Sequence, residues 1–201
     1  MAERDGHAFI PAALEAGAAA YLTSQEPVGG TAIRVRDTAA ALLSLGAFAR
    51  GRVGGAIGIT GSVGKTTTKD LLAGCLASTF STGASERSFN NELGLPLTLL
   101  NAPDDAQWVV LEMGARDAGH IERLAEVARP DVGIVTSVAM AHVEYFGDLD
   151  GVARAKGGLV AALPASGLAV LNFDDPRVRD MALVSPCPVL GYAVGADAEV
   201  R

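Results

Sequence analysis

Short apolar runs alternate with helix-periodic segments along most of this chain. The apolar runs predict strands at 56–60, 108–112, 132–136, 168–172 and 189–192. Helical patterns occupy the intervals between or after them, at 67–78, 93–100, 120–128, 149–163 and 176–181. Near-continuously apolar strands that alternate with helices are typical of a mostly parallel sheet covered by helices on both faces. The predicted fold class is therefore α/β.

The first fifty residues have a looser pattern of the same kind. We predict a helix over 9–20, short strands at 19–23 and 32–35, and a helix over 38–49 that Asp37 and Thr38 cap. Residues 50–55, which read Arg-Gly-Arg-Val-Gly-Gly, interrupt the pattern. The sequence therefore predicts two domains, a small partial α/β domain over 1–50 and a larger α/β domain over 51–201.

Composition narrows the class of protein further. Hydrophobic residues make up 49% of the 201 residues and aromatic residues only 5%, so the core is expected to be aliphatic. A formal charge of -7 argues against a sequence-independent nucleic-acid binder, which needs a basic surface. Cys75 and Cys187 are too few for a disulfide framework, and no apolar run approaches the roughly 18 residues of a membrane span. The expected location is the cytoplasm.

Residues 58–68 read Gly-Ile-Thr-Gly-Ser-Val-Gly-Lys-Thr-Thr-Thr and join a predicted strand to a predicted helix. Glycines let a backbone close around an anion, and the N–H groups of the loop and helix start then point at it. We expect Lys65 to reach the β- and γ-phosphates of a nucleoside triphosphate, and the Thr66 hydroxyl to contact Mg²⁺. The alternative is a glycine turn that ends the strand and binds no ligand. The predicted ATP site comprises Thr60, Gly61, Ser62, Val63, Gly64, Lys65, Thr66 and Thr67.

Polar residues follow or end the predicted strands, where ligands of parallel sheets bind. Glu112 ends an apolar strand, and such a carboxylate beside a phosphate loop commonly positions Mg²⁺, although a solvated acid would have the same pattern. His142 lies just after another strand, and a structural histidine is an equal alternative. Lys156 lies in an Ala-, Leu- and Val-rich helical run, where the pattern alone favours a surface lysine.

Six motifs together resemble the Mur ligase family, the ATP-dependent amide ligases of peptidoglycan assembly. They are Thr60-Gly-Ser-Val-Gly-Lys-Thr-Thr67, Asn90-Asn-Glu-Leu-Gly94, Glu112-Met-Gly-Ala115, Ala141-His-Val-Glu-Tyr-Phe-Gly147, Ala155-Lys-Gly157 and Leu171-Asn-Phe-Asp-Asp175. The second and third look most like the family member that adds D-alanyl-D-alanine to UDP-N-acetylmuramoyl-tripeptide. The resemblance covers nearly the whole chain, and it implies that residues 1–50 are part of a UDP-substrate domain and 51–201 an ATP-binding central domain.

The resemblance also implies roles for individual residues. Lys65, Lys156 and His142 are expected to be catalytic, and Lys156 looks like the lysine that family members carbamylate with CO₂. Thr66, Glu112 and His142 look like ligands of Mg²⁺. Four further residues are expected to contact ligands: Asn90 and Asn91 the UDP-substrate, and Asn172 and Asp175 the adenine of ATP.

The implied reaction is phosphorylation of the substrate carboxylate by ATP, followed by attack of the dipeptide amine on the acyl phosphate. Three features depart from the family pattern. The segment before the histidine, residues 137–141, reads Ser-Val-Ala-Met-Ala and lacks the asparagine often found there. Gly158 stands where family members usually have a glutamate, and loss of an acid near the metal is expected to weaken Mg²⁺ binding. The chain also matches only part of such a ligase. We therefore expect little activity from it alone, because closure over ATP and amine positioning need a further domain.

Three other functions remain open at this stage. A related ligase of the same superfamily would act on another amino acid, a folate or a polyglutamate. A non-catalytic nucleotide-binding module would retain the loop without the chemistry, and Gly158 favours it. An ordinary phosphate-loop kinase or ATPase is disfavoured, because two residues rather than the usual four separate Gly61 from Gly64. The sequence does not indicate an oligomeric state.

Overall fold

The structure of the chain is a computed structural model that describes residues 5–87, 89–140, 146–195 and 198. The chain divides into two compact units, residues 1–42 and 43–201. The division falls within helix α2 (Thr38–Arg50), which the Asp37 carboxylate caps by accepting from the N–H groups of Ala39 and Ala40. The assignment of the two predicted domains to a substrate domain and an ATP-binding domain stays a prediction.

The smaller unit contains a parallel pair of short strands, β1 (Tyr21–Thr23) and β2 (Ala32–Arg34). A 3-10 turn (Gly6–Phe9) and helix α1 (Ile10–Glu15) precede them. The helix predicted over 9–20 is therefore wrong in its second half. Gly17 adopts a left-handed φ of 91°, and the Ala18 N–H donates back to the Ala13 carbonyl, which ends the helix.

The larger unit is built on a six-stranded parallel sheet with the order β4-β5-β3-β6-β7-β8. Five of its strands match the predicted runs closely: β3 (Gly55–Thr60), β5 (Trp108–Glu112), β6 (Val132–Val135), β7 (Leu168–Asn172) and β8 (Val189–Tyr192). The sixth, β4 (Thr82–Ala84), was not predicted. It is three residues long, contains a glycine and pairs only with β5 at the sheet edge, so it lacks an apolar run.

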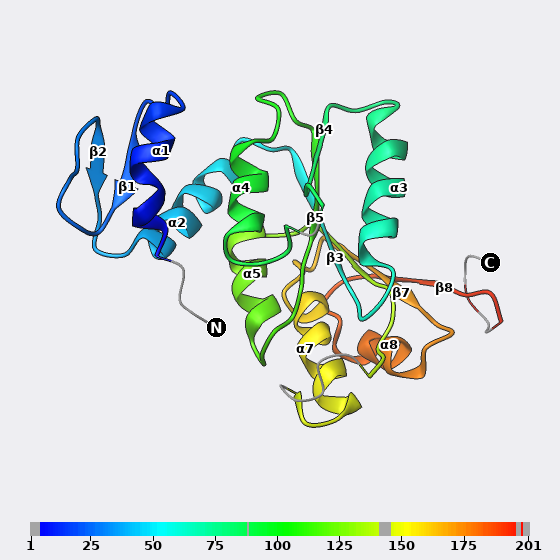
Figure 1. Cartoon of the computed structure of the whole chain (residues 1–201). Coiled ribbons are helices and arrows are strands. Elements are labelled where there is room, and N and C mark those ends of the chain that lie inside the picture. Colours follow the sequence, from blue (N-terminus) through cyan, green and yellow to red (C-terminus); the bar gives the residue numbers. More distant parts are fainter. Residues whose placement is uncertain (1–4, 88, 141–145, 196–197, 199–201) are drawn as a thin grey trace. The chain divides into compact units, whose positions relative to one another are not determined.

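Helices cover both faces of this sheet, which confirms the predicted fold class. Helix α3 (Lys65–Ala77) lies on one side, and α4 (Gly94–Leu100) and α5 (His120–Ala128) lie on the other (Figure 1). Two further helices among the described residues are α7 (Leu149–Ala161) and α8 (Pro176–Asp180), and a 3-10 turn (Met181–Val184) follows α8. No helix among the residues that the structure describes is long and apolar enough to cross a membrane.

The core consists of aliphatic layers on the two faces of the sheet. Alternate residues of β5 point to opposite faces, so Val109 and Leu111 pack with α4 and α5, whereas Val110 joins the cluster that α3 covers. A third cluster lies between α7, α8 and the strands β6 and β7. This packing fixes the carboxyl ends of β3, β5 and β6 side by side, because the three strands are parallel neighbours.

Candidate functional site

The loop between β3 and α3 has the conformation of an anion-binding turn. Gly61 (φ 150°) and Gly64 (φ 89°) both adopt positive φ values, which glycine tolerates without strain. A side chain at Gly61 would collide with Thr136 Oγ1, so this position also needs glycine for space. The predicted strand, loop and helix are therefore present, and both glycines are required by the local geometry.

The segment after β6 holds this loop in place. The Thr136 hydroxyl donates to the Val63 carbonyl (2.6 Å), and the Val63 N–H donates to Ser137 Oγ (3.1 Å). Ser62 bonds to the same segment, since its N–H donates to the Ser137 carbonyl and its hydroxyl bonds to the backbone of Ala139. These contacts fix the loop before any ligand binds, which lowers the conformational cost of binding.

The start of α3 presents unpaired donors at the carboxyl edge of the sheet. Among the described residues, no carbonyl accepts from the N–H groups of residues 64–67, whereas Thr68 N–H donates to the Gly64 carbonyl. The Lys65 ammonium lies across the loop, 2.7 Å from the Gly61 carbonyl oxygen. Burial lowers the Lys65 pKa below its ordinary value, and the Glu112 carboxylate opposes that shift. Free N–H groups at a helix start beside a lysine form a site for phosphate.

Glu112 ends β5 and is 1% exposed, and both of its carboxylate oxygens are hydrogen bonded. The Thr66 hydroxyl donates to Oε2 (2.7 Å), and the Asn90 amide donates to Oε1 (2.8 Å). The Glu112 N–H donates to the Ser85 hydroxyl oxygen (3.2 Å). Three predicted site residues, Thr66, Asn90 and Glu112, therefore meet in one hydrogen-bonded group beside the loop.

Lys156 lies on α7 and is only 6% exposed, so it is not the surface lysine that its sequence pattern favours. Burial, and to a smaller extent the charge of Lys65, lower the pKa of Lys156 to about 8. The two lysine ammonium groups are thus close enough to repel one another. A lysine with this pKa is partly neutral near physiological pH, which makes its nitrogen available as a nucleophile.

The other predicted site residues have structural contacts in the described chain. Thr60 is buried and donates to the Met113 carbonyl, and Thr67 is exposed at the helix start. The Asn91 side chain accepts from the N–H groups that begin α4. Asn172 donates to the Thr136 carbonyl, and Asp175 both caps α8 and accepts from the Val138 N–H. His142 lies outside the described residues.

The donor set at Glu112 fits Mg²⁺. Thr66 and Glu112 offer hard oxygen atoms, which Mg²⁺ prefers, and they lie beside the phosphate loop. The described residues contain no group of three or more His, Cys, Asp or Glu side chains that could hold a metal by themselves. Mg²⁺ usually binds one or two protein oxygens and completes its coordination with water and phosphate oxygens.

A side chain at position 158 would face the Glu122 side of α7. A side chain at this position would meet the Glu122 carboxylate of α5, with Oε1 at 2.5 Å and Oε2 at 2.7 Å from the added Cβ. Residues 156 and 158 are about 200° apart around a helix, so Lys156 and a side chain at 158 face opposite ways. An acid at 158 would therefore not lie beside Lys156, and this geometry argues against a direct effect of Gly158 on metal binding.

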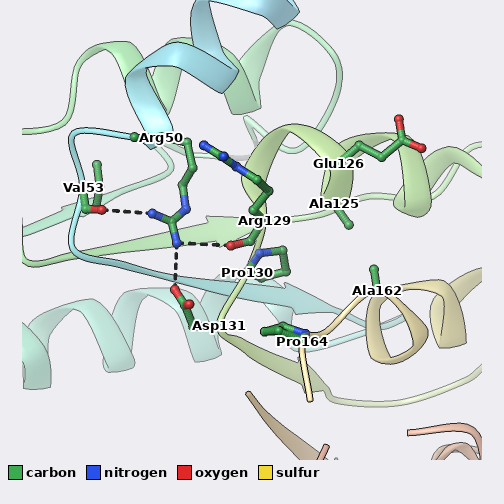
Figure 2. A pocket seen from close by; sticks show the side chains of 10 residues that line it. Arg50, Val53, Ala125, Glu126, Arg129, Pro130, Asp131, Ala162 and Pro164 are labelled. Carbon is green, nitrogen blue, oxygen red and sulfur yellow. Dashed lines mark hydrogen bonds and ion pairs between the residues drawn. The ribbon is translucent and has the colours of Figure 1, made fainter. Parts of the chain in front are cut away.

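A hollow of about 680 Å³ lies at the opposite, amino-terminal edge of the sheet, near Val53, Asp131 and Pro164. Figure 2 shows that its most conspicuous polar group, the Arg50 guanidinium, is engaged by the protein itself. Arg50 bonds to the Val53 and Arg129 carbonyls and to the Asp131 carboxylate (2.8 Å). The hollow shares no residue with the phosphate loop, so we assign Arg50 a structural role: it joins the chain at Val53 to the chain at 129–131.

The sequence analysis did not identify the residues that support the phosphate loop and Glu112 without contacting a ligand themselves. Thr136 and Ser137 hold the phosphate loop, Ser85 accepts from the Glu112 N–H, and Lys69 donates to the Ser85 carbonyl. The strand end at Thr136 was a usable signal, because parallel strand ends converge. Lys69 gave no signal, since a lysine next to Asp70 in a polar helix start has the pattern of an exposed residue.

Comparison with known proteins decides which family has this arrangement. The model of the Mur ligase middle domain matches residues 59–201. The chain belongs to the Mur ligase family. The UDP-N-acetylmuramoyl-tripeptide--D-alanyl-D-alanine ligase of Mycobacterium tuberculosis is 41% identical over 214 aligned positions, and the alignment covers 94% of this chain but 42% of that protein. The ligase of the same name from Escherichia coli is 36% identical, with 85% and 38% covered.

Solved structures of Mur ligases agree with this assignment. MurF ligase from Thermotoga maritima in complex with ADP superimposes with a TM-score of 0.83 at 33% identity, covering 96% of this chain and 45% of that one. MurF from Acinetobacter baumannii gives a TM-score of 0.86 at 28% identity, with 96% and 44% covered. The chain thus spans less than half the length of these Mur ligase relatives, and it has both their sequence motifs and their fold.

Proposed function

We propose that this chain forms the ATP-binding part of a Mur ligase that joins D-alanyl-D-alanine to UDP-N-acetylmuramoyl-tripeptide. The observation that carries the proposal is the hydrogen-bonded group of Thr66, Glu112 and Asn90 beside Lys65 and the phosphate loop. A simple nucleotide-binding module has no need for a buried carboxylate whose two oxygens are both held by side chains. Relatives named for this reaction share 36–41% identity with the chain.

In this proposal the phosphate loop binds and orients ATP. The N–H groups of residues 64–67 and the Lys65 ammonium contact the β- and γ-phosphates and stabilise the charge that develops on the transferring group. Thr66 and Glu112 would hold Mg²⁺, and His142 is proposed as a further ligand. When bound, Mg²⁺ offsets the repulsion between the attacking carboxylate and the γ-phosphate.

Two steps account for the reaction. A carboxylate oxygen of the UDP-tripeptide attacks the γ-phosphorus, the bond from phosphorus to the bridging oxygen of ATP breaks, and ADP leaves. The amine of D-alanyl-D-alanine then attacks the acyl carbon, inorganic phosphate leaves, and the nitrogen loses a proton to form the amide. The protein forms no covalent intermediate in this scheme, so its residues act by positioning and by charge.

We propose that Lys156 is carbamylated. With a pKa of about 8, about a quarter of its amine is neutral at pH 7.5, compared with about one part in a thousand for an ordinary lysine. The neutral nitrogen attacks CO₂, a bond from nitrogen to carbon forms, and a proton is released to water. The product is an anion, so the Lys65 charge that repels the ammonium would stabilise the carbamate.

Further assignments belong to the same proposal. Residues 1–50 are proposed to be part of a UDP-substrate domain and 51–201 the ATP-binding domain. Asn90 and Asn91 are proposed to frame the UDP-substrate, although Asn91 also caps α4. The adenine is proposed to bind near Asn172 and Asp175. The reaction is proposed to take place in the cytoplasm.

The test is a phosphate-release assay on the proposed ligase that contains this chain. ATP, Mg²⁺, UDP-N-acetylmuramoyl-tripeptide and D-alanyl-D-alanine are supplied together, and each is then omitted in turn. We expect phosphate release only when the tripeptide carboxylate is present, and amide product only when the dipeptide is added. Lys65→Ala is expected to abolish both.

Other outcomes would identify a different function. Phosphate release that needs a folate or a free amino acid, and is unaffected by the UDP-tripeptide, would indicate a related ligase with another substrate. Phosphate transfer to water or to a small alcohol without any carboxylate would indicate an ATPase or kinase. ATP binding without turnover in the whole protein would indicate a non-catalytic module. For Lys156, a carbamate signal in ¹³C NMR with ¹³CO₂ that persists in Lys156→Arg would contradict its carbamylation.

A further inference from the structure

Lys69 is a buried charged residue that the proposed mechanism does not use. It lies on α3 and is 3% exposed. Its ammonium contacts three oxygen acceptors: the Ser85 carbonyl at 2.7 Å, the Arg87 carbonyl at 3.3 Å and Asp70 Oδ1 at 2.8 Å. An ammonium group has three N–H donors, so the acceptors around Lys69 match its full hydrogen-bonding capacity. Two of the three belong to the segment that follows β4.

The segment tied to Lys69 also supports Glu112. The Ser85 hydroxyl accepts from the Glu112 N–H (3.2 Å), and Asn90 donates to Glu112 Oε1 (2.8 Å). The Asn90 carbonyl also accepts from the Gly114 N–H (2.8 Å), just after β5. Both ends of this short segment therefore contact the strand end that carries the carboxylate.

The segment that follows β4 contains a residue in an unfavourable backbone conformation, which a contact from outside the segment can stabilise. Arg87 adopts a left-handed φ of 49°, which costs energy for a residue with a side chain. The Lys69 ammonium bonds to the carbonyl of this same residue. A buried donor at that carbonyl favours this conformation of Arg87.

Helix α3 thus acts on Glu112 in two ways. Thr66 contacts the carboxylate directly, and Lys69, one turn later on the same helix, holds the segment that presents Ser85 and Asn90 to it. Residues three apart on a helix lie on one face, so both contacts are set by a single rigid element.

We propose that Lys69 is a positioning residue for the magnesium-binding carboxylate, which it orients through Ser85 and Asn90. This inference rests on the proposed function, in which Glu112 and Thr66 hold the Mg²⁺ that accompanies ATP. Within the described residues, the Lys69 ammonium bonds to Ser85, Arg87 and Asp70, and not to the phosphate loop carbonyls or the Glu112 carboxylate. Its effect is therefore on the contribution of Mg²⁺ to ATP binding, rather than on the contact of the loop with phosphate.

The test compares equilibrium binding of ATP to the 201-residue chain in excess Mg²⁺ and in EDTA. The ratio of the two affinities measures the contribution of Mg²⁺. Lys69→Met removes all three donors, and we expect it to lower this ratio by about tenfold while changing the affinity in EDTA by less than about twofold. Lys69→Arg keeps donors at this position and is expected to restore most of the ratio.

Two further variants make the test specific. Asp70→Ala removes the acceptor on α3 and leaves the two bonds to the segment, so it is the matched control and should retain the wild-type ratio. Asn90→Ala is expected to lower the ratio as Lys69→Met does, and the double variant should lower it no more than the larger single effect, because both act through one network. If Lys69→Met does not fold, Lys69→Gln takes its place. Its shorter amide offers two donors in place of three, so we expect the ratio to fall in the same direction by a smaller factor.

Three results would overturn the inference. Lys69→Met could retain the wild-type ratio, lose affinity equally with and without Mg²⁺, or combine additively with Asn90→Ala. The first would show that Lys69 does not act on the metal, the second that it supports the loop generally, and the third that its effect does not pass through Asn90. If the folded wild-type chain binds no ATP in either buffer, the proposed function fails first, before any variant is compared, and the inference fails with it.

Discussion

Replacing Lys156 with methionine should make the chain more stable at neutral pH. The ammonium of this residue is removed from water within α7 and lies near a second lysine, and its pKa falls from 10.5 to about 8. At 1.36 kcal/mol for each unit, that lowering corresponds to about 3 kcal/mol of folding free energy lost while the group is charged. Methionine has a similar length and no charge, so Lys156→Met should recover up to about 3 kcal/mol at pH 7.

The same shift predicts how stability depends on pH. The folded chain releases this proton near pH 8 and the unfolded chain near 10.5, so between these values the unfolded state binds more protons. The free energy of unfolding contributed by Lys156 therefore rises with pH across that window, by about 1.4 kcal/mol per unit. Below pH 8 the penalty is present in full, and above about 10.5 it is gone. In Lys156→Met this rise should be absent.

Urea denaturation followed by the fluorescence of Trp108, the single tryptophan, measures both effects. The buffers are purged of CO₂, because carbamylation would remove the positive charge. Arg154→Met is the matched control: it lies on the same helix but is exposed, and we expect its pH profile to match that of the wild type. The reasoning would be refuted if Lys156→Met were no more stable than the wild type at pH 7 and the two pH profiles ran parallel.

Two other substitutions test the structure away from the phosphate loop. Gly158→Ala forces its Cβ against the Glu122 carboxylate and should lower the free energy of unfolding by about 1–3 kcal/mol in denaturant. Gly157→Ala, whose Cβ has its nearest neighbour at 3.9 Å, should not lower it. Glu122→Ala should restore the stability of Gly158→Ala, and equal losses at both glycines would contradict this packing. Arg50→Met removes one of the two donors to the Asp131 carboxylate and the donor to the Val53 carbonyl, so it should cost about 1–3 kcal/mol. The ATP affinity of the folded fraction should be unchanged. A large loss of ATP affinity would show that the hollow at the amino-terminal edge contributes to the site.

Sequence patterns predicted the elements whose burial is uniform along the chain. Strand β5 is apolar up to Leu111 because helices cover both faces of the sheet, and its predicted bounds were confirmed. Strand β4 is short and lies at the sheet edge, so packing does not require an apolar run there. Helix α1 ends early because Gly17 takes a left-handed conformation, although alanines that favour helix follow it.

Some features of the candidate site could likewise be predicted from the sequence, and others could not. Thr66 and Glu112 were predictable partners, since the carboxyl ends of neighbouring parallel strands meet at one edge. The burial of Lys69 and Lys156 was not predictable from pattern, because each is buried by segments distant in sequence. The direction of Gly158 also needed the structure: its place in the motif suggested a missing metal ligand, whereas its Cα faces Glu122 on α5.

Equilibrium binding of Mg²⁺-ATP to this chain, beside Lys65→Ala, tests the central claim most directly. The pre-ordered loop, the unpaired N–H groups of residues 64–67 and the Thr66–Glu112 pair are all present in the described chain. We therefore expect the wild-type chain to bind Mg²⁺-ATP and the variant to lose that binding while unfolding at the same denaturant concentration. Equal binding by both, or no binding by a chain shown to be folded, would contradict the assignment of this loop as the ATP site.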